Sequence, residues 1–151
     1  MVRVVIQRVS RAAVRVDGET VATIGRGLLL LVGLEKGDDG ARVDRAARKI
    51  AGLRVFEDGE GRIDRGLAEA GGAILAVSQF TLAGSLVRGR RPSFDRAMPS
   101  EEARPLFDRF VAGLRGEGVS VETGVFGAMM EVELVNDGPV TLIWEERETT
   151  G

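Results

Sequence analysis

The chain has 151 residues, a formal net charge of −2, and neither histidine nor cysteine. This length suits one domain with a core of its own, and we expect a single domain over residues 1–151. The missing residue types exclude disulfides, thiolate and imidazole metal ligands, Ser-His-Asp and Cys-His triads, and an imidazole base. The small negative charge is not typical of a general nucleic-acid coat, although a local basic site is compatible with it.

Hydropathy gives no sign of a membrane segment. The longest apolar stretch, GLLLLVGLE, is far shorter than a spanning helix, and the opening MVRVVIQRVS alternates where a signal peptide would be continuously apolar. We therefore expect a soluble, cytoplasmic protein without a membrane partner.

The first half of the chain reads as strands followed by a helix. Alternation predicts strands over Val2 to Ser10 and over Ala12 to Gly25, the latter turning at Asp17-Gly18. The continuously apolar run Gly27 to Glu35 predicts a strand that is buried on both faces. Asp38 or Asp39 can then cap a helix, because apolar residues recur at helical spacing on one face, at Val43, Ala46, Ala47, Ile50 and Leu53.

The second half continues with short elements. We expect a hairpin about Asp58-Gly59, a buried strand over Gly71 to Leu82, an arginine-rich loop over Ala83 to Pro99, and a helix capped by Ser100. That helix should bury Leu106, Phe107, Phe110, Val111 and Leu114. Strands at Val119 to Glu122 and Met129 to Val135 precede Gly138-Pro139 and a last strand that ends near Glu145. The pattern predicts one compact α+β domain with two main helices and an antiparallel or mixed, barrel-like sheet.

Polar side chains end the second buried strand. In VSQFTLAGS, the residues Ser78, Gln79, Phe80 and Thr81 follow apolar residues. Hydroxyls, an amide and free backbone N–H groups at a rigid strand end can line a site and stabilise an oxyanion. A strand whose polar side chains only face water explains this stretch equally well.

The arginine-rich loop contains RGRRPSF, in which Arg88, Arg90 and Arg91 precede Phe94. Guanidinium groups bind phosphate through two donors at once, and a nearby aromatic ring can stack on a base. For an arginine run considered alone, a solvated loop remains the simpler interpretation.

The dipeptide Gly138-Pro139 interrupts the apolar pattern of VELVNDGPVTLIWEE. A proline beside a strand removes a ladder hydrogen bond and is tolerated mainly at edges, first positions or turns. Considered alone, the dipeptide favours an Asn-Asp-Gly hairpin whose second strand opens with Pro139. The alternative is a rigid turn that points two carbonyl groups at a ligand.

Taken together, these stretches resemble the bacterial-type D-aminoacyl-tRNA deacylases over the whole chain. The residues that carry the resemblance are IQRVSRAAV (6–14), GLLLLVGLEKGD (27–38), AGGAILAVSQFTLAG (70–84), RGRRPSF (88–94) and TGVFGAMMEVELVNDGPVT (123–141). The signatures SQFTLA and NDGPVT are the most specific part when they occur together at this separation, whereas either one alone would be weak evidence.

The resemblance implies an enzyme that cleaves the ester between a D-amino acid and the terminal ribose of tRNA, without cofactor or metal. The substrate's ribose hydroxyl and main-chain groups around Phe80 and Thr81 would assist, while Ser78 and Gln79 shape the pocket. Thr81 as an attacking hydroxyl is a competing proposal, which is disfavoured because the chain offers no evident base to activate it.

The resemblance also implies a homodimer, in which a cis Gly138-Pro139 bond of one subunit reaches into the partner's active site. Its carbonyls, with Asn136 beside them and Arg8 in support, would hold the substrate's α-amino group so that an L side chain collides with the wall. Glycine has no side chain to reject, so glycyl-tRNA, including glycine mischarged on tRNA(Ala), should also be cleaved.

The resemblance further implies that the protein binds the aminoacyl-tRNA at its 3′ acceptor end. Its terminal adenine would rest against Phe126 and the loop that carries Arg88, Arg90 and Arg91. Contact with only this end would explain how an acidic protein acts on tRNA.

Two other functions stay open on the residues alone. A non-catalytic RNA- or nucleotide-binding barrel would use the same arginine loop and would be indifferent to the ester's stereochemistry. A magnesium-dependent hydrolase built on Asp58, Glu60 and Asp64 would lose activity with EDTA, although carboxylates at a hairpin turn are usually solvated.

Overall fold

Strand β1 (Val2–Val16) is the strand around which the sheet is built. One edge of β1 pairs with β3 (Gly27–Gly33) along its first half and with β2 (Glu19–Ile24) along its second half. The other edge pairs with β8 (Glu131–Glu146) over almost its whole length. Because one strand holds three partners, the sheet must bend, and it curls toward a barrel.

The computed structural model describes residues 1–146. The remaining elements are α1 (Gly40–Ala51), β4 (Phe56–Glu57), β5 (Ile63–Arg65), α2 (Leu67–Ala70), β6 (Ala73–Ser78), the 3-10 turn η1 (Phe80–Ala83), α3 (Ser100–Gly116) and β7 (Val121–Thr123). Strand β6 pairs in parallel with β3, and β7 pairs in parallel with β6, whereas the pairs made by β1 are antiparallel. The predicted α+β domain with a mixed, barrel-like sheet is confirmed.

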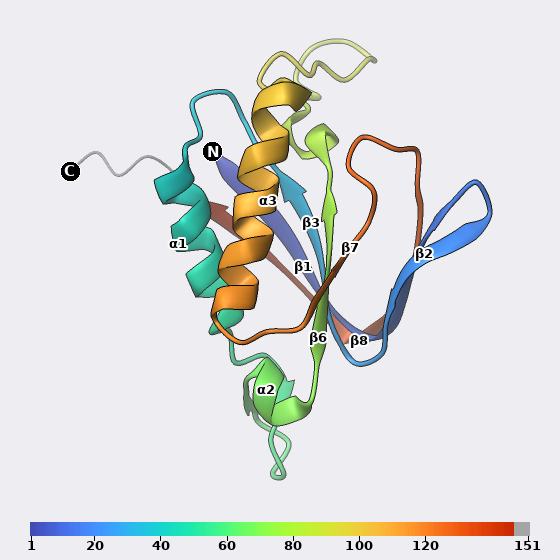
Figure 1. Cartoon of the computed structure of the whole chain (residues 1–151), viewed down its shortest axis with the longest axis vertical. Coiled ribbons are helices and arrows are strands. Elements are labelled where there is room, and N and C mark those ends of the chain that lie inside the picture. The colour runs from blue at the N-terminus through green and yellow to red at the C-terminus, as the bar shows by residue number, and fades with distance from the viewer. Residues whose placement is uncertain (147–151) are drawn as a thin grey trace.

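Helices α1 and α3 lie side by side on one face of the sheet (Figure 1). Most of the apolar residues predicted for their inner faces are buried, with Val43, Ala46, Ala47 and Ile50 on α1 and Phe107, Phe110, Val111 and Leu114 on α3. Leu53 and Leu106 are only half-buried, and Leu53 lies beyond the end of α1. Fully burying one large aliphatic or aromatic side chain contributes roughly 1.5–3 kcal/mol to folding. On the helices' outer side, Arg109 and Asp44 form an ion pair of 2.7 Å that ties α3 to α1.

The start of α1 agrees with the sequence prediction, whereas the start of α3 differs from it. Asp39 caps α1 by accepting a hydrogen bond from the Arg42 N–H. Asp38 is instead buried and accepts a hydrogen bond from the Glu35 N–H at 2.7 Å. Ser100 does not cap α3: it is the first helical residue, and Pro99 is the N-cap, with its carbonyl accepting the first helical bonds.

The opposite face of the sheet forms a second apolar cluster. Its buried members are Val9, Ala12, Val14, Ala22, Ile24, Leu29, Leu75 and Val77. Leu29 and Leu75 alternate with residues that face the helices, so β3 and β6 are buried on both sides. The prediction that this run forms a strand buried on both faces is thereby confirmed, since such a strand needs a continuous apolar run, although β3 ends at Gly33 and not at Glu35.

The hairpin expected at Gly138-Pro139 is wrong. Strand β8 continues through this dipeptide and stays paired with β1 on both sides of it. Asn136 lies opposite Val9 and Thr141 lies opposite Gln7, so residues 137–140 bulge out against Arg8 alone. The peptide bond between Gly138 and Pro139 is cis. A bulge fits the sequence as well as a turn does, since in both the proline lies where the sheet needs no N–H hydrogen bond from it.

Several element boundaries also differ from the prediction. The first two predicted strands are divided differently, because β1 runs without a break to the Asp17-Gly18 turn. Strand β6 stops at Ser78, and Phe80 to Leu82 form the turn η1 where strand was expected. Besides the two main helices there is the short α2, which the sequence did not indicate.

In the described part of the chain, no helix has both the length and the apolar character needed to cross a membrane.

Candidate active site

A pocket of about 620 Å³ opens where β3 and β6 end, between η1, the start of α3 and the segment before β8. It is lined by Val32, Leu34, Val77, Ser78, Gln79, Phe80, Thr81, Met98, Ser100, Ala103, Phe126, Gly127, Ala128, Met129, Met130 and Val132. The four residues of the SQFT stretch therefore come together here with Phe126. Met98, Ser100 and Met130 were not predicted, because nothing in their local sequence marks them as lining a site.

The end of β6 shapes this pocket. The Gln79 N–H makes the last bond to β3, to the Val32 carbonyl at 2.7 Å, and the chain then turns into η1. The N–H groups of Phe80 and Thr81 stand at the start of this turn, where a helix has no internal acceptor for them. Gly33 allows η1 to pack closely against β3, since a Cβ on Gly33 would lie 2.7 Å from Cβ of Leu82.

The pocket wall is mostly apolar, and its polar side chains are uncharged, from Ser78, Gln79, Thr81 and Ser100. Gln79 donates from Nε2 to the Thr81 hydroxyl at 3.1 Å. None of the described residues that line the pocket is Asp, Glu, Lys or Arg. The site can therefore offer hydrogen bonds and shape to a substrate, but its lining supplies no side chain that could act as a general base.

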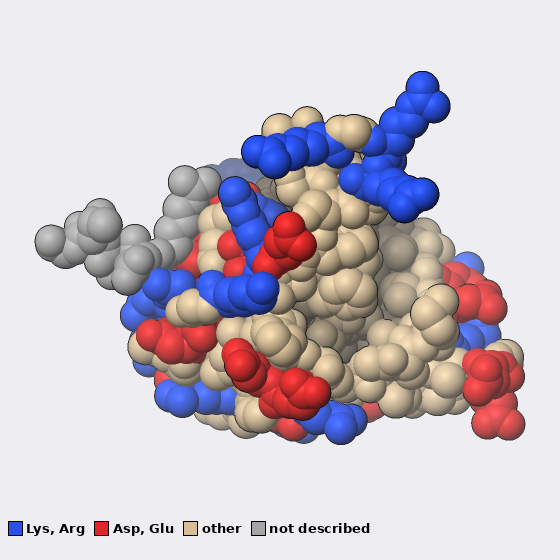
Figure 2. All heavy atoms as spheres, turned by 90° about the horizontal axis from the view of Figure 1, so that it is seen from above, with Lys and Arg blue, Asp and Glu red and all other residues tan. Residues whose placement is uncertain are grey.

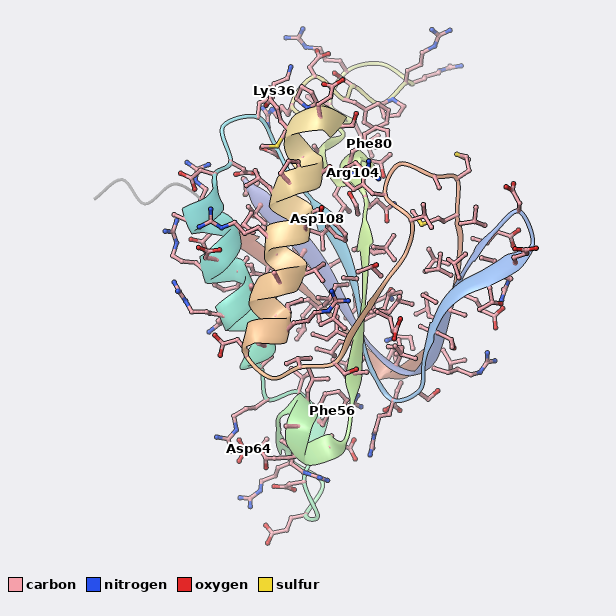
Figure 3. All side chains as sticks on the ribbon, viewed as in Figure 1. Lys36, Phe56, Asp64, Phe80, Arg104 and Asp108 are labelled. Carbon is pink, nitrogen blue, oxygen red and sulfur yellow. The ribbon has the colours of Figure 1, made fainter. Side chains whose placement is uncertain are left out.

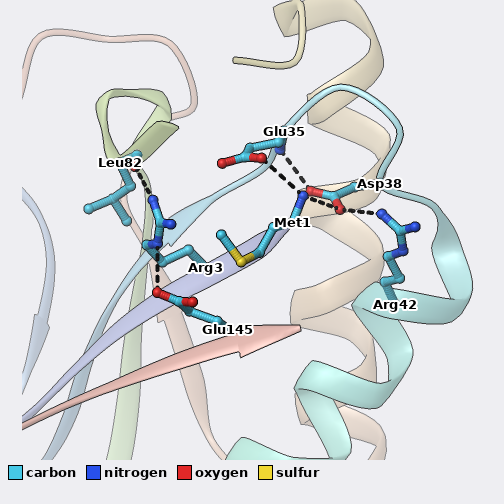
Figure 4. Close-up of polar contacts among 7 residues, drawn as sticks. All are labelled: Met1, Arg3, Glu35, Asp38, Arg42, Leu82 and Glu145. Atoms are coloured by element: carbon cyan, nitrogen blue, oxygen red, sulfur yellow. Dashed lines mark hydrogen bonds and ion pairs between the residues drawn. The ribbon is translucent and has the colours of Figure 1, made fainter. Parts of the chain in front are cut away.

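Arg3 supports η1 from the neighbouring strand (Figure 4). Its Nη1 donates to the Leu82 carbonyl at 2.7 Å, and its Nε pairs with Glu145 of β8 at 3.3 Å. One guanidinium thus joins β8 to the turn that carries Phe80 and Thr81. The sequence shows Arg3 only as an alternating residue of a strand, so it gave no sign of this contact.

Phe126 borders the pocket between two side chains of α3. Its ring centroid lies 6.0 Å from that of Phe107, and the Arg104 guanidinium carbon lies 5.4 Å from its centroid. Phe80 and Arg104 lie toward the same end of the molecule (Figure 3). The ring of Phe126 is half-buried and held in place, as a stacking platform requires.

Gly138 and Pro139 are not among the described residues that line this pocket. Along the strands, Arg8 pairs with Leu28 whereas Ser78 pairs with Val32, a separation of four residues or roughly 13 Å in the strand direction. Within one chain, the bulge and the pocket are therefore two separate places.

Side-chain hydrogen bonds from Arg8 and Asn136 hold the bulge in shape. Arg8 is only 4% exposed, and it donates to the carbonyls of Asp137 at 3.2 Å and Val55 at 2.9 Å. The Asn136 amide donates to the carbonyls of Arg8 at 2.9 Å and Val140 at 3.0 Å, which closes the base of the bulge. Gly138 has φ of +126°, where a side chain would be strained, and both Gly138 and Pro139 are exposed.

The arginine-rich loop lies beside the pocket. Ser85 and Ser93 pair as an antiparallel bridge that closes the loop, and Phe94 packs edge-on against Phe80 with centroids 5.4 Å apart. Figure 2, a view onto this end, shows Lys and Arg side chains projecting next to an uncharged hollow. Arg88, Arg90 and Arg91 are all exposed.

The carboxylates considered for magnesium have other partners. Hydrogen bonds from the backbone N–H groups of Arg62 and Glu60 hold the pKa of the Asp58 carboxyl below its ordinary value. Glu60 pairs with Arg62 at 2.7 Å, and Asp64 pairs with Arg54 at 3.1 Å. Asp64 also lies at the far end of the molecule from Phe80 (Figure 3). Within residues 1–146, no three acidic side chains gather as a metal site.

Comparison with known proteins gives consistent matches. The family model described as D-Tyr-tRNA(Tyr) deacylase matches residues 5–145. The D-aminoacyl-tRNA deacylase of Symbiobacterium thermophilum is 58% identical over 149 residues, which are 99% of each chain. That of Thermomicrobium roseum is 56% identical over 149 residues, covering 99% of this chain and 97% of the relative.

Solved structures share the fold. The c-Myc DNA Unwinding Element Binding Protein superposes with a TM-score of 0.89 at 39% identity, covering 97% of this chain and 99% of that one. A probable eukaryotic D-amino acid tRNA deacylase gives a TM-score of 0.80 at 21% identity, which supports the fold alone. Because the family model and the bacterial relatives span almost the whole sequence, the chain belongs to the D-Tyr-tRNA(Tyr) deacylase family.

Proposed function

We propose that the protein hydrolyses D-aminoacyl-tRNA and so removes D-amino acids from tRNA before translation uses them. Water adds to the ester carbonyl, the bond to the ribose oxygen breaks, and the products are free D-amino acid and tRNA with its hydroxyl restored. The observation that carries this proposal is a pocket with hydroxyls, an amide and the backbone N–H groups at the start of η1, but no ionisable side chain among the described residues that line it. Such a site suits an ester that is already labile.

The backbone supplies the main assistance in this proposal. The N–H groups of Phe80 and Thr81 would stabilise the charge that develops on the carbonyl oxygen, and the substrate's neighbouring ribose hydroxyl would help the attack. Ser78 and Gln79 shape the wall. The Thr81 hydroxyl already accepts a hydrogen bond from Gln79, which fits a positioning role better than that of a nucleophile.

Chiral selection would need a second copy of the chain. We infer a homodimer in which Gly138 and Pro139 of one subunit enter the pocket of the other. Three features support this: the bulge is exposed, it lies apart from its own pocket, and β8 exposes the apolar side chains Val135, Leu142 and Ile143, which a partner would cover. Carbonyl groups of the bulge would hold the α-amino group so that an L side chain meets the wall.

Glycyl-tRNA should be a substrate by the same reasoning, because glycine has no side chain to exclude. The terminal adenine would stack on Phe126, and the loop with Arg88, Arg90 and Arg91 would meet the acceptor end. Only a few phosphates need be contacted, which is compatible with the net charge of −2.

The test is ester loss from D-tyrosyl-tRNA, L-tyrosyl-tRNA and glycyl-tRNA(Ala), each with and without EDTA. Loss of the D and glycyl esters at the same rate with EDTA, with the L ester spared, would support the proposal. Hydrolysis of neither D nor L ester would refute it. Light scattering on the purified protein gives the mass independently, and a monomer at the assay concentration would refute the cross-subunit arrangement.

A non-catalytic nucleic-acid-binding protein is the second candidate. It is favoured by one observation, the likeness to a protein named for binding a DNA unwinding element. This alternative predicts binding of RNA or DNA with no difference between D and L esters, so the same assay separates the two.

A further inference from the structure

The loop from Ala83 to Pro99 carries a charge unlike that of the whole chain. It contains four arginines and one aspartate, a net charge of +3, whereas the whole chain has −2. No side chain of these four arginines forms an ion pair or hydrogen bond with any described residue. Arginines on β1 behave differently, since Arg11 and Arg15 both pair with Glu133. Unpaired guanidinium groups remain available for an anion from outside.

Two of these arginines meet at a second cavity. It has a volume of about 350 Å³ and is lined by Ser85, Val87, Arg88, Ser93, Asp95 and Arg96. The Ser85–Ser93 bridge, with N–H to carbonyl distances of 2.7 and 2.9 Å, brings together the two sides of the loop. Arg90 and Arg91 are not in this lining. The fold therefore separates one pair of arginines, which share a cavity, from the other pair.

Both serine hydroxyls are suited to an anionic guest. Ser85 Oγ accepts from the Val87 N–H at 3.4 Å, and Ser93 Oγ accepts from the Asp95 N–H at 3.5 Å. Each hydroxyl uses its oxygen in that contact, so its proton stays free to donate. The Asp95 carboxylate offsets one of the two guanidinium charges. The remaining positive charge matches the single negative charge of one phosphodiester.

An aromatic ridge, formed by Phe80 and Phe94, joins the lining of the active-site pocket to that of this cavity. Phe80 lines the pocket, and Phe94 lies between Ser93 and Asp95 in the sequence. The two rings meet edge to face and remain 57% and 39% exposed. Gly84 permits this contact, because a Cβ on it would lie 2.9 Å from the Phe94 ring. Exposed rings next to unpaired cations are how proteins bind single-stranded nucleic acid.

We propose that the cavity of Arg88 and Arg96 binds a phosphodiester of the unpaired 3′ end of the tRNA substrate, with a base stacked on the Phe80–Phe94 ridge. The inference rests on the proposed function, which puts the terminal nucleoside in the adjacent pocket. Guanidinium forks and serine hydroxyls would bind the phosphate oxygens. The strand would thus run from the pocket over the ridge to the cavity.

The test compares two substrates, D-tyrosyl-tRNA and D-tyrosyl-adenosine, which has the same ester but no phosphate. The double variant Arg88→Gln/Arg96→Gln should lose about tenfold or more in kcat/KM on the tRNA. The fold loss in kcat/KM on the nucleoside ester should be at least ten times smaller. Its slope of log kcat/KM against log salt should become shallower by about 0.7 for the lost phosphate contact. Asp95→Asn should increase kcat/KM on the tRNA by removing a repelling charge.

One matched pair controls for charge alone. Arg26→Gln/Arg48→Gln removes two exposed arginines outside the loop. If this pair lowers kcat/KM on the tRNA as much as Arg88→Gln/Arg96→Gln does, general electrostatic attraction explains the loss and the inference is wrong. Equal losses on both substrates would also overturn it. If the wild type cleaves neither substrate, the proposed function itself has failed, a result distinct from these.

Discussion

Gln79 donates a hydrogen bond from its side-chain amide to the hydroxyl of Thr81, across 3.1 Å and only two residues along the chain. The bond fixes the Thr81 side chain at the pocket wall, with one oxygen lone pair already in use. No carboxylate, Lys or Arg lines the pocket in the described part of the chain. A threonine placed in this way can help to orient a substrate, but it has no partner that would remove its proton.

Thr81→Val should therefore reduce kcat/KM for D-tyrosyl-tRNA by less than about tenfold, the effect of losing roughly one neutral hydrogen bond. Removal of a true nucleophile costs about 10⁴-fold or more. Single-turnover hydrolysis separates these values clearly. A loss of the larger size in a protein with an unchanged melting temperature would assign the attack to Thr81.

Gly138→Ala should abolish most activity on the D ester while the domain still folds. Gly138 has φ of +126°, and an added Cβ would lie 2.9 Å from Val140 and 3.2 Å from the Arg8 guanidinium, so the bulge must change shape. The measurement is kcat/KM together with the melting temperature. Gly18→Ala is the matched control, because Gly18 also has positive φ but has open space around it, in the β1–β2 turn. Equal activity losses in the two variants would contradict a specific role for the bulge.

Arg3→Met should lower kcat by about tenfold with little change in KM, since a charge-assisted hydrogen bond to the Leu82 carbonyl is lost and η1 is less firmly held. Steady-state kinetics on D-tyrosyl-tRNA give both values. Arg11→Met serves as the control, because Arg11 also joins β1 to β8, through Glu133, but makes no contact with η1. An unchanged kcat in Arg3→Met would show that η1 keeps its shape without this support.

Acid should weaken the contact between α1 and α3. The side-chain hydrogen bond from Arg109 lowers the pKa of the Asp44 carboxyl below its ordinary value of 3.8. The folded protein therefore binds this proton less readily than the unfolded chain does, so the stabilisation is present above the ordinary pKa and is lost as pH falls through the folded value. Melting temperatures between pH 6 and pH 2.5 should fall less steeply for Asp44→Asn than for the wild type. Parallel curves would show that the ion pair does not contribute.

Much of the candidate site could be predicted from short stretches. SQFTLA at the end of a buried strand indicated a polar wall, and Ser78 to Thr81 do line one pocket together with Phe126. The boundaries of helices and strands were harder to predict. The turn η1 takes the place of predicted strand after Ser78, and β8 runs through Gly138, where a hairpin was expected. A glycine-proline pair fits both a turn and a bulge, and the choice depends on how β1 pairs with both flanks.

The sequence by itself determined the family, the alternation of strands and helices, the buried faces of α1 and α3, and the absence of histidine and cysteine chemistry. These follow from residue identity, periodicity and turn residues, which act between near neighbours. Only the tertiary structure decided that Arg3 supports the Leu82 carbonyl, that Arg8 is buried beneath the bulge, and that Arg88 and Arg96 share a cavity. Such contacts depend on strand register and loop closure between segments far apart in the chain, and no local pattern encodes that pairing.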